Sequence, residues 1–141
     1  MAFAGINYGA VLAAAAAAWI LGAAWYSALT KPWVAAQGKT MDEFKRQAQA
    51  QGAAALLPYG LAFVAELVMA WVLAGVMGHL GQVTLRNGVI SALFVWLGFV
   101  VTTIGVNNLF GMRKPMLTAI DAGHWLAVLV LMGAIIGLIG V

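Results

Sequence analysis

Cysteine is absent from the chain, and charged residues are scarce: of 141 residues, seven are Lys or Arg and only four are Asp or Glu. The lack of cysteine excludes disulfides and thiolate metal sites. A charged fraction of 8% is about a third of that in soluble domains, and it excludes a soluble or a disordered chain. The length excludes a large multidomain enzyme. What remains is 65% apolar residues, the composition of a membrane protein.

Four apolar stretches are each long enough to cross a bilayer, which takes about 20 residues in a helix. The predicted spans cover residues 7–29, 54–77, 87–110 and 117–141. Backbone groups in lipid must be hydrogen-bonded within their own segment, and the alternation typical of barrel strands is absent. The sequence therefore predicts an all-α polytopic membrane protein, a four-helix bundle forming a single integral membrane domain over residues 1–141.

Only the connection over residues 30–53 is long. Pro32 is expected to end the first span, because proline cannot continue a helix and disfavours helical geometry in the residue before it. Thr40 and Glu43 form a capping box pattern, which predicts a short amphipathic helix from residue 41 to about residue 51. We expect this helix to lie on the membrane surface with Phe44 facing lipid. A solvated linker helix is the alternative.

The basic residues are distributed unevenly among the three connections. The first connection holds Lys31, Lys39, Lys45 and Arg46, the third holds Arg113 and Lys114, and the second holds only Arg86. By the positive-inside rule, the first and third connections are cytoplasmic and both termini are not. We expect a multi-pass protein of the bacterial inner (plasma) membrane. The net charge of +3 then reflects membrane lipids as partners, and no nucleic-acid motif is present.

Polar side chains of all four spans lie at similar depths on the expected cytoplasmic side. At about 1.5 Å per residue, Asp121 lies roughly 9 Å inward and His124 about 14 Å, while Glu66 lies about 18 Å inward, near the midplane. The candidate binding or transport residues are Glu66, Asp121, His124, Asn107, Asn108, Thr103, Tyr59, Trp25, Tyr26 and Ser27. We expect them to meet in a pocket among the helices.

Two interpretations are open for the ionisable members of this layer. Glu66 is either a protonated group that hydrogen-bonds a neighbouring helix or a functional site, since intramembrane carboxylates commonly mark transport paths. Asp121 and His124 are three residues apart and share a helix face. They form either a structural cluster, in which Asp121 fixes the tautomer of His124 and Asn107 or Asn108 completes the hydrogen bonds, or a functional site. Glu66, Asp121 and His124 could form a metal site, but the chain has a single Asp-x-x-His pair and no second one. No metal and no cofactor is therefore predicted.

Small residues predict close helix contacts. Gly133 and Gly137 form a GxxxG pattern, which either drives dimerisation or packs helices within one subunit. The alanine-rich first span is expected to lie buried between its neighbours.

The motifs of the spans resemble a known family. Its pattern is matched by Trp25-Tyr26-Ser27 with Lys31 and Trp33, by Leu67-Val68-Met69-Ala70, by Trp96-Leu97-Gly98-Phe99 with Thr102-Thr103 and Asn107-Asn108, and by Gly123-His124. In order and spacing these motifs resemble the domain of unknown function 1761, a family of small bacterial and fungal membrane proteins. The chain departs from that family at Ala28, where proline is common, and at Asp121, where asparagine is common. The resemblance implies a fold and a membrane location, but no activity.

The sequence is compatible with two alternative functions. The first is a small transporter or permeation protein, expected to form a homo-oligomer, whose polar cluster opens to the cytoplasm. The second is a structural or accessory membrane protein whose polar cluster only specifies helix packing. An enzyme is not expected, because no nucleophile has an activating base beside it in the pattern.

Overall fold

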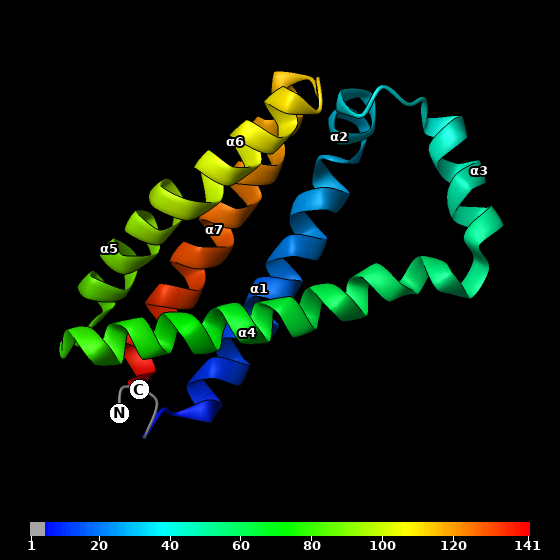
Figure 1. Cartoon of the computed structure of the whole chain (residues 1–141). Helices are drawn as coiled ribbons and strands as arrows, with labels where there is room; N and C mark the ends of the chain where they lie inside the picture. The colour runs from blue at the N-terminus through cyan, green and yellow to red at the C-terminus, as the bar shows by residue number, and fades with distance from the viewer. Residues whose placement is uncertain (1–4) are drawn as a thin grey trace.

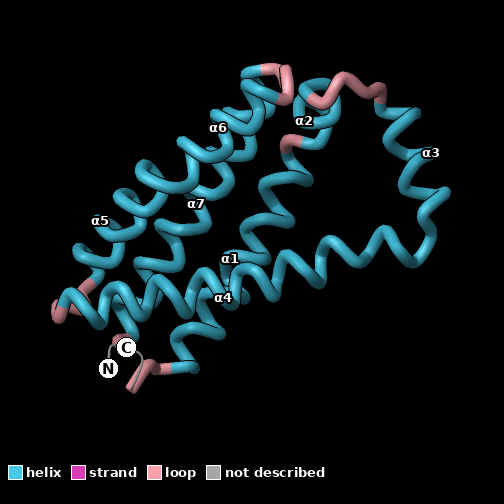
Figure 2. The backbone as a smooth tube through the Cα atoms, viewed as in Figure 1, coloured by secondary structure: helices cyan, strands magenta, loops and turns pink. Residues whose placement is uncertain are grey.

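The computed structural model describes residues 5–141, and all the regular structure in this range is helical (Figure 2). Four helical segments are long and apolar enough to cross a membrane. The all-α fold with four candidate spans is therefore confirmed. The spans are α1 (Tyr8–Ala28), α4 (Leu57–Leu80), the continuous α5 (Leu85–Val95), η2 (Trp96–Val100) and α6 (Val101–Phe110), and α7 (Pro115–Ile139).

Helix α7 is the central element. It packs against α1 on one side and against α5 and α6 on the other, and these helices run alongside one another (Figure 1). Helix α4 crosses this group obliquely and contacts both α1 and α7. The apolar core at the crossing contains Ala14 and Ala18 of α1, Ala70 of α4, and Val128 and Met132 of α7, all fully buried. Alanine at these positions lets the backbones approach closely.

The long connection contains more structure than the sequence predicts. A short helix, α2 (Thr30–Ala36), follows α1 after a break at Leu29. Pro32 therefore does not end helical structure here. It lies in the first turn of α2, where backbone amides have no partner within the helix and proline is tolerated.

Helix α3 (Met41–Gln51) begins with the predicted capping box. The Thr40 amide donates to Glu43 Oε2 at 2.8 Å, and the Glu43 amide donates to Thr40 Oγ1 at 3.2 Å. Phe44 packs edge-on against Trp33, with ring centroids 6.0 Å apart. Phe44 thus covers an aromatic side chain of α2 in addition to any lipid contact.

The glycines of α7 pack within the subunit. A Cβ atom on Gly133 would collide with the Gly88 carbonyl of α5, and one on Gly137 would collide with the Thr84 carbonyl. The GxxxG pattern thus packs two helices within one subunit. Its glycines let the backbones of α5 and α7 come into direct contact.

The turn from α6 to α7 and the first part of the long connection, α2, lie at the same end of the molecule, opposite the start of α1, the turn from α4 to α5 and the end of α7 (Figure 1). Helix α3 then runs from this end along the side of the molecule to the start of α4. The two basic connections also touch, because Lys114 Nζ donates to the Ala35 carbonyl at 3.1 Å. The polar residues near this end are the ones that the fold brings together.

Candidate functional site

Asp121 of α7 is the meeting point of three helices. Its Oδ1 atom accepts a hydrogen bond of 2.8 Å from the Tyr26 hydroxyl of α1 and one of 3.1 Å from Trp33 Nε1 of α2. Both donors reach the same oxygen. These bonds fix the Asp121 side chain and tie α1 and α2 to α7, since hydrogen bonds to a charged acceptor are stronger than neutral ones.

His124 lies one turn deeper in α7 and is 5% exposed. Its ring contacts the rings of Tyr26 and Trp125, with centroids 4.9 and 4.7 Å away. Gly22 of α1 makes room for it, because a Cβ atom there would lie 2.9 Å from His124 Nε2. The buried Nδ1 atom has no hydrogen-bond partner within residues 5–141. Such a group is a candidate for contact with a solute or a proton.

Two indoles hold the backbone of the same turn of α7. Trp25 Nε1 donates to the Ile120 carbonyl at 3.2 Å, and Trp96 Nε1 donates to the Ala122 carbonyl at 2.8 Å. Trp96 begins the π-helical segment η2 in the third span, and π-helical turns are frequent at functional sites. Together, Trp25, Tyr26, Trp33 and Trp96 form an aromatic clamp around residues 120–124.

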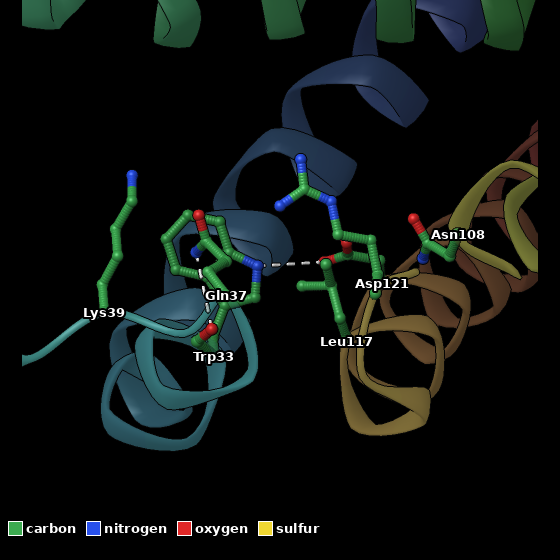
Figure 3. A pocket seen from close by; sticks show the side chains of 7 residues that line it. Trp33, Gln37, Lys39, Asn108, Leu117 and Asp121 are labelled. Carbon is green, nitrogen blue, oxygen red and sulfur yellow. Dashed lines mark hydrogen bonds between the residues drawn. The ribbon is translucent and has the colours of Figure 1, made fainter. Parts of the chain in front are cut away.

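A polar cleft of about 340 Å³ opens beside the clamp (Figure 3). It is lined by Trp33, Gln37, Lys39, Asn108, Arg113, Leu117 and Asp121. The lining thus comes from α2 and the residues after it, from the end of α6 and from the start of α7, which is the end of the molecule where the basic connections meet. The cleft has the volume of a small-molecule site, with a carboxylate among its walls.

The family model described as "Protein of unknown function (DUF1761)" matches residues 9–137, nearly the whole chain. The chain belongs to the DUF1761 family. No curated protein and no solved structure matches it. The family name assigns no activity to this DUF1761 protein, so its function must be argued from the site.

Several candidate residues of this DUF1761 protein lie at or near the cleft. Trp25 and Tyr26 belong to the aromatic clamp, and Asp121 and His124 lie inside it. Asn108 lines the cleft, and its Nδ2 atom donates to Thr118 Oγ1 at 3.0 Å rather than to Asp121. The amide thus joins α6 to α7.

The other candidates lie apart from the clamp. Asn107 and Ser27 are exposed, and the Thr103 hydroxyl donates to the Phe99 carbonyl of the preceding helical turn. Tyr59 is 58% exposed, and its backbone carbonyl accepts a hydrogen bond from Trp19. A shared depth therefore does not place these side chains on the same face.

Glu66 is 2% exposed and lies on the face of α4 that packs on the core with Ala70 and Leu73. It is not among the residues that line the cleft. Its Oε2 atom is buried without a hydrogen-bond partner in the described part of the chain. Glu66 thus forms a second buried polar position, on a different helix from Asp121.

The three ionisable candidates do not form a metal site in this structure. Over residues 5–141, no group of three His, Asp or Glu side chains is arranged to hold a metal ion. Six residues of the site were not among the candidates: Trp33, Gln37, Lys39, Arg113, Leu117 and Trp96. For Trp96 a signal exists, because an indole deep in a span needs a hydrogen-bond acceptor.

Proposed function

We propose that this DUF1761 protein is a small transporter or permeation protein of the bacterial inner membrane, which takes up a small polar solute through the polar cleft. One observation carries the proposal: the cleft opens where the basic connections meet and reaches Asp121, a carboxylate within a candidate membrane span. Ionisable residues inside membrane spans commonly mark solute or proton paths. The solute would meet Asp121 first and His124 one turn deeper.

The proposed route is closed beyond His124. Val128, Met132 and Ile136 follow on α7 and are fully buried in the apolar core. A solute cannot pass these side chains without a rearrangement of the helices. The proposal therefore includes a second conformation that opens the far half, as in alternating access, rather than a permanently open channel.

We also propose a homo-oligomer surrounded by membrane lipids. A single subunit of four spans has a narrow interior, and the first half of α4 lies beyond the side of the other helices (Figure 1). Leu57, Leu61 and Val64 on this segment are more than half exposed. These apolar side chains favour contact with lipid or with a second subunit.

Swelling of proteoliposomes in iso-osmotic solute tests the transport proposal. Purified protein is reconstituted, and light scattering is recorded with glycine, glycerol or choline chloride outside. We expect faster swelling than in protein-free liposomes for at least one solute, slower swelling with Asp121→Ala, and no change with Arg86→Gln at the opposite end of the fold. Swelling equal to that of protein-free liposomes for all three solutes would contradict the proposal.

Glu66 is proposed to carry a proton during transport, because it is a buried carboxyl group with an unpartnered oxygen. A dye that reports internal pH measures proton entry into the same proteoliposomes. We expect Glu66→Gln, which keeps the shape but cannot ionise, to reduce this entry. An unchanged rate would remove Glu66 from the mechanism.

A specific observation also favours the accessory alternative. Asp121 Oδ1 already accepts two hydrogen bonds that connect α1, α2 and α7, as a packing device would. An accessory protein of this kind would lose thermal stability in detergent with His124→Ala or Asn108→Ala, while no solute crosses the bilayer. The swelling experiment separates the two functions.

A further inference from the structure

The walls of the polar cleft carry charges of both signs. Arg113 and Lys39 are cationic, and Asp121 is anionic. The Arg113 guanidinium makes no hydrogen bond or ion pair to any side chain of residues 5–141. The Lys39 ammonium donates to Gln47 Oε1 at 2.9 Å, and its charge helps to lower the pKa of the Glu43 carboxyl group. Of the two cations, Arg113 is therefore the one that the described residues leave without a partner.

Asp121 also keeps an unused acceptor. Both of its hydrogen bonds, from Tyr26 and Trp33, end on Oδ1. In the part of the chain that the structure describes, Oδ2 accepts none. The second carboxylate oxygen is therefore available to a donor in the cleft, while the first holds the side chain in place.

We infer that the cleft binds a small zwitterion, with its primary ammonium group on Asp121 Oδ2 and its carboxylate or phosphate group on the Arg113 guanidinium. This inference names the substrate class of the proposed function and rests on it. Guanidinium matches carboxylate and phosphate groups through paired N–H donors. An ammonium group donates up to three hydrogen bonds and complements the free oxygen of Asp121.

Ligands of a single charge fit this lining less well. A simple anion on Arg113 would leave the half-buried Asp121 carboxylate without a charged partner, which costs free energy. A simple cation on Asp121 would make no use of the Arg113 guanidinium, which is exposed at the rim of the cleft. The volume of about 340 Å³ admits an amino acid or a phosphoethanolamine group, each of which carries both charges.

This chemistry has two sources. A free amino acid would enter from water, and a phosphatidylethanolamine headgroup would enter from the lipid leaflet beside the basic connections. Both offer a primary ammonium group a few bonds from an acidic group. Phosphatidylcholine has the same charges but no ammonium N–H, so it serves as the matched lipid control.

Tryptophan fluorescence and thermal unfolding of the purified full-length protein measure binding, because Trp33 lines the cleft. The soluble probes are glycine and O-phosphoethanolamine, with acetate, ethylamine and inorganic phosphate as singly functional controls. We expect at least one zwitterion to bind about tenfold more tightly than every control, which corresponds to about 1.4 kcal/mol. Nanodiscs of phosphatidylcholine with and without phosphatidylethanolamine test the lipid source.

Arg113→Gln and Asp121→Asn are each expected to weaken zwitterion binding at least about tenfold. Asp121→Asn keeps an oxygen for Tyr26 and Trp33 and removes only the charge, so the protein should still fold. Arg86→Gln, outside the cleft, is the control and should bind normally. Thermal unfolding without ligand identifies a variant that fails to fold.

The outcomes separate this inference from the transport proposal. Equal binding of acetate or phosphate and the zwitterions would overturn the inference, and so would binding that survives Asp121→Asn. Binding without any swelling of proteoliposomes would support the zwitterion site and contradict transport. Swelling with glycerol or choline chloride, together with no binding of any zwitterion, would support transport and contradict the zwitterion site.

Discussion

At the scale of single residues, the Asp121 carboxylate organises the site through its two hydrogen bonds. Tyr26 and Trp33 come from positions 95 and 88 residues earlier in the chain, so each bond restrains a long loop. A hydrogen bond between membrane helices contributes about 0.6 kcal/mol on average and up to about 1.7 kcal/mol. The carboxylate acceptor places these bonds toward the upper end of that range.

Tyr26→Phe removes one of these donors without changing the ring that packs on His124. We expect the free energy of unfolding in detergent to fall by about 1 to 1.7 kcal/mol. Tyr59→Phe is the matched control, because Tyr59 is 58% exposed and bonds through its backbone carbonyl. Unfolding followed by far-UV circular dichroism measures both. Equal stability of the two variants would show that the Tyr26 bond contributes nothing.

The residue scale is also where the sequence was least informative. Depth along a helix is readable from sequence at about 1.5 Å per residue, and it placed Tyr26 and Asp121 at one level and His124 one turn deeper. Rotation about the helix axis is not readable in spans that are apolar on nearly all sides. Asn107 and Thr103 therefore share the level of Asp121 but not its hydrogen bonds, and Asn108 bonds to Thr118.

At the scale of elements, glycine decides which helices touch. Gly88 and Gly133 lie where α5 and α7 meet at backbone contact, whereas Gly105 of α6 has open space where a Cβ would lie. The sequence showed the GxxxG pattern but not its partner helix. Four apolar spans offer several helix pairs with small residues, and only the crossing geometry selects one of them.

Gly88→Ala should force α5 and α7 apart, because its Cβ atom would overlap the Gly133 carbonyl. We expect a loss of stability above about 2 kcal/mol, as for overpacked cores. Gly105→Ala should be neutral or stabilising by up to about 1 kcal/mol, since alanine is the better helix former. Thermal unfolding in detergent compares the two. Similar losses would mean that the close contact is not maintained.

The capping box of α3 predicts a pH dependence outside the spans. The hydrogen bond from the Thr40 amide lowers the pKa of Glu43 below its ordinary value. A carboxylate with a lowered pKa stabilises the folded form above its unfolded pKa, and this contribution is lost as the pH falls through the folded pKa. The start of α3 should therefore fray in acid.

Hydrogen exchange measured by mass spectrometry, corrected for the intrinsic effect of pH, tests this prediction. We expect protection of residues 41–46 to fall between neutral pH and pH values below about 4, the ordinary range of a glutamate pKa. Glu43→Gln is the control, because glutamine can complete a capping box but does not titrate. Its protection should change little over the same range, and α7 should be unaffected in both proteins.

At the scale of the whole molecule, hydropathy was sufficient to predict the four candidate spans, because every segment that crosses a membrane must be long and apolar. It could not supply the oblique path of α4, the short helix α2 or the π-helical turn at Trp96. These features depend on side-chain packing and hydrogen bonds between helices. One example is the hydrogen bond that Trp96 Nε1 donates to the Ala122 carbonyl. Glu66 consequently lies on the α4 face buried in the core instead of lining the cleft.

The oblique α4 makes membrane topology the decisive test of the whole arrangement. Its 24 residues extend about 36 Å at about 1.5 Å per residue, enough to cross about 30 Å of hydrocarbon while tilted. If α4 spans, the first and third connections lie on one side and the turn from α4 to α5 on the other. If α4 lies in the plane of the membrane, its two ends share a side.

Single cysteines distinguish these arrangements directly, because the chain has no cysteine of its own. Lys45→Cys, Met112→Cys and Gln82→Cys, all at exposed positions, are labelled with a membrane-impermeant maleimide. By the charge distribution we expect positions 45 and 112 to react only in inside-out vesicles and position 82 only in intact cells. Labelling of 45 and 82 from the same side would mean that α4 does not span, and the cleft would then lie in a three-span protein.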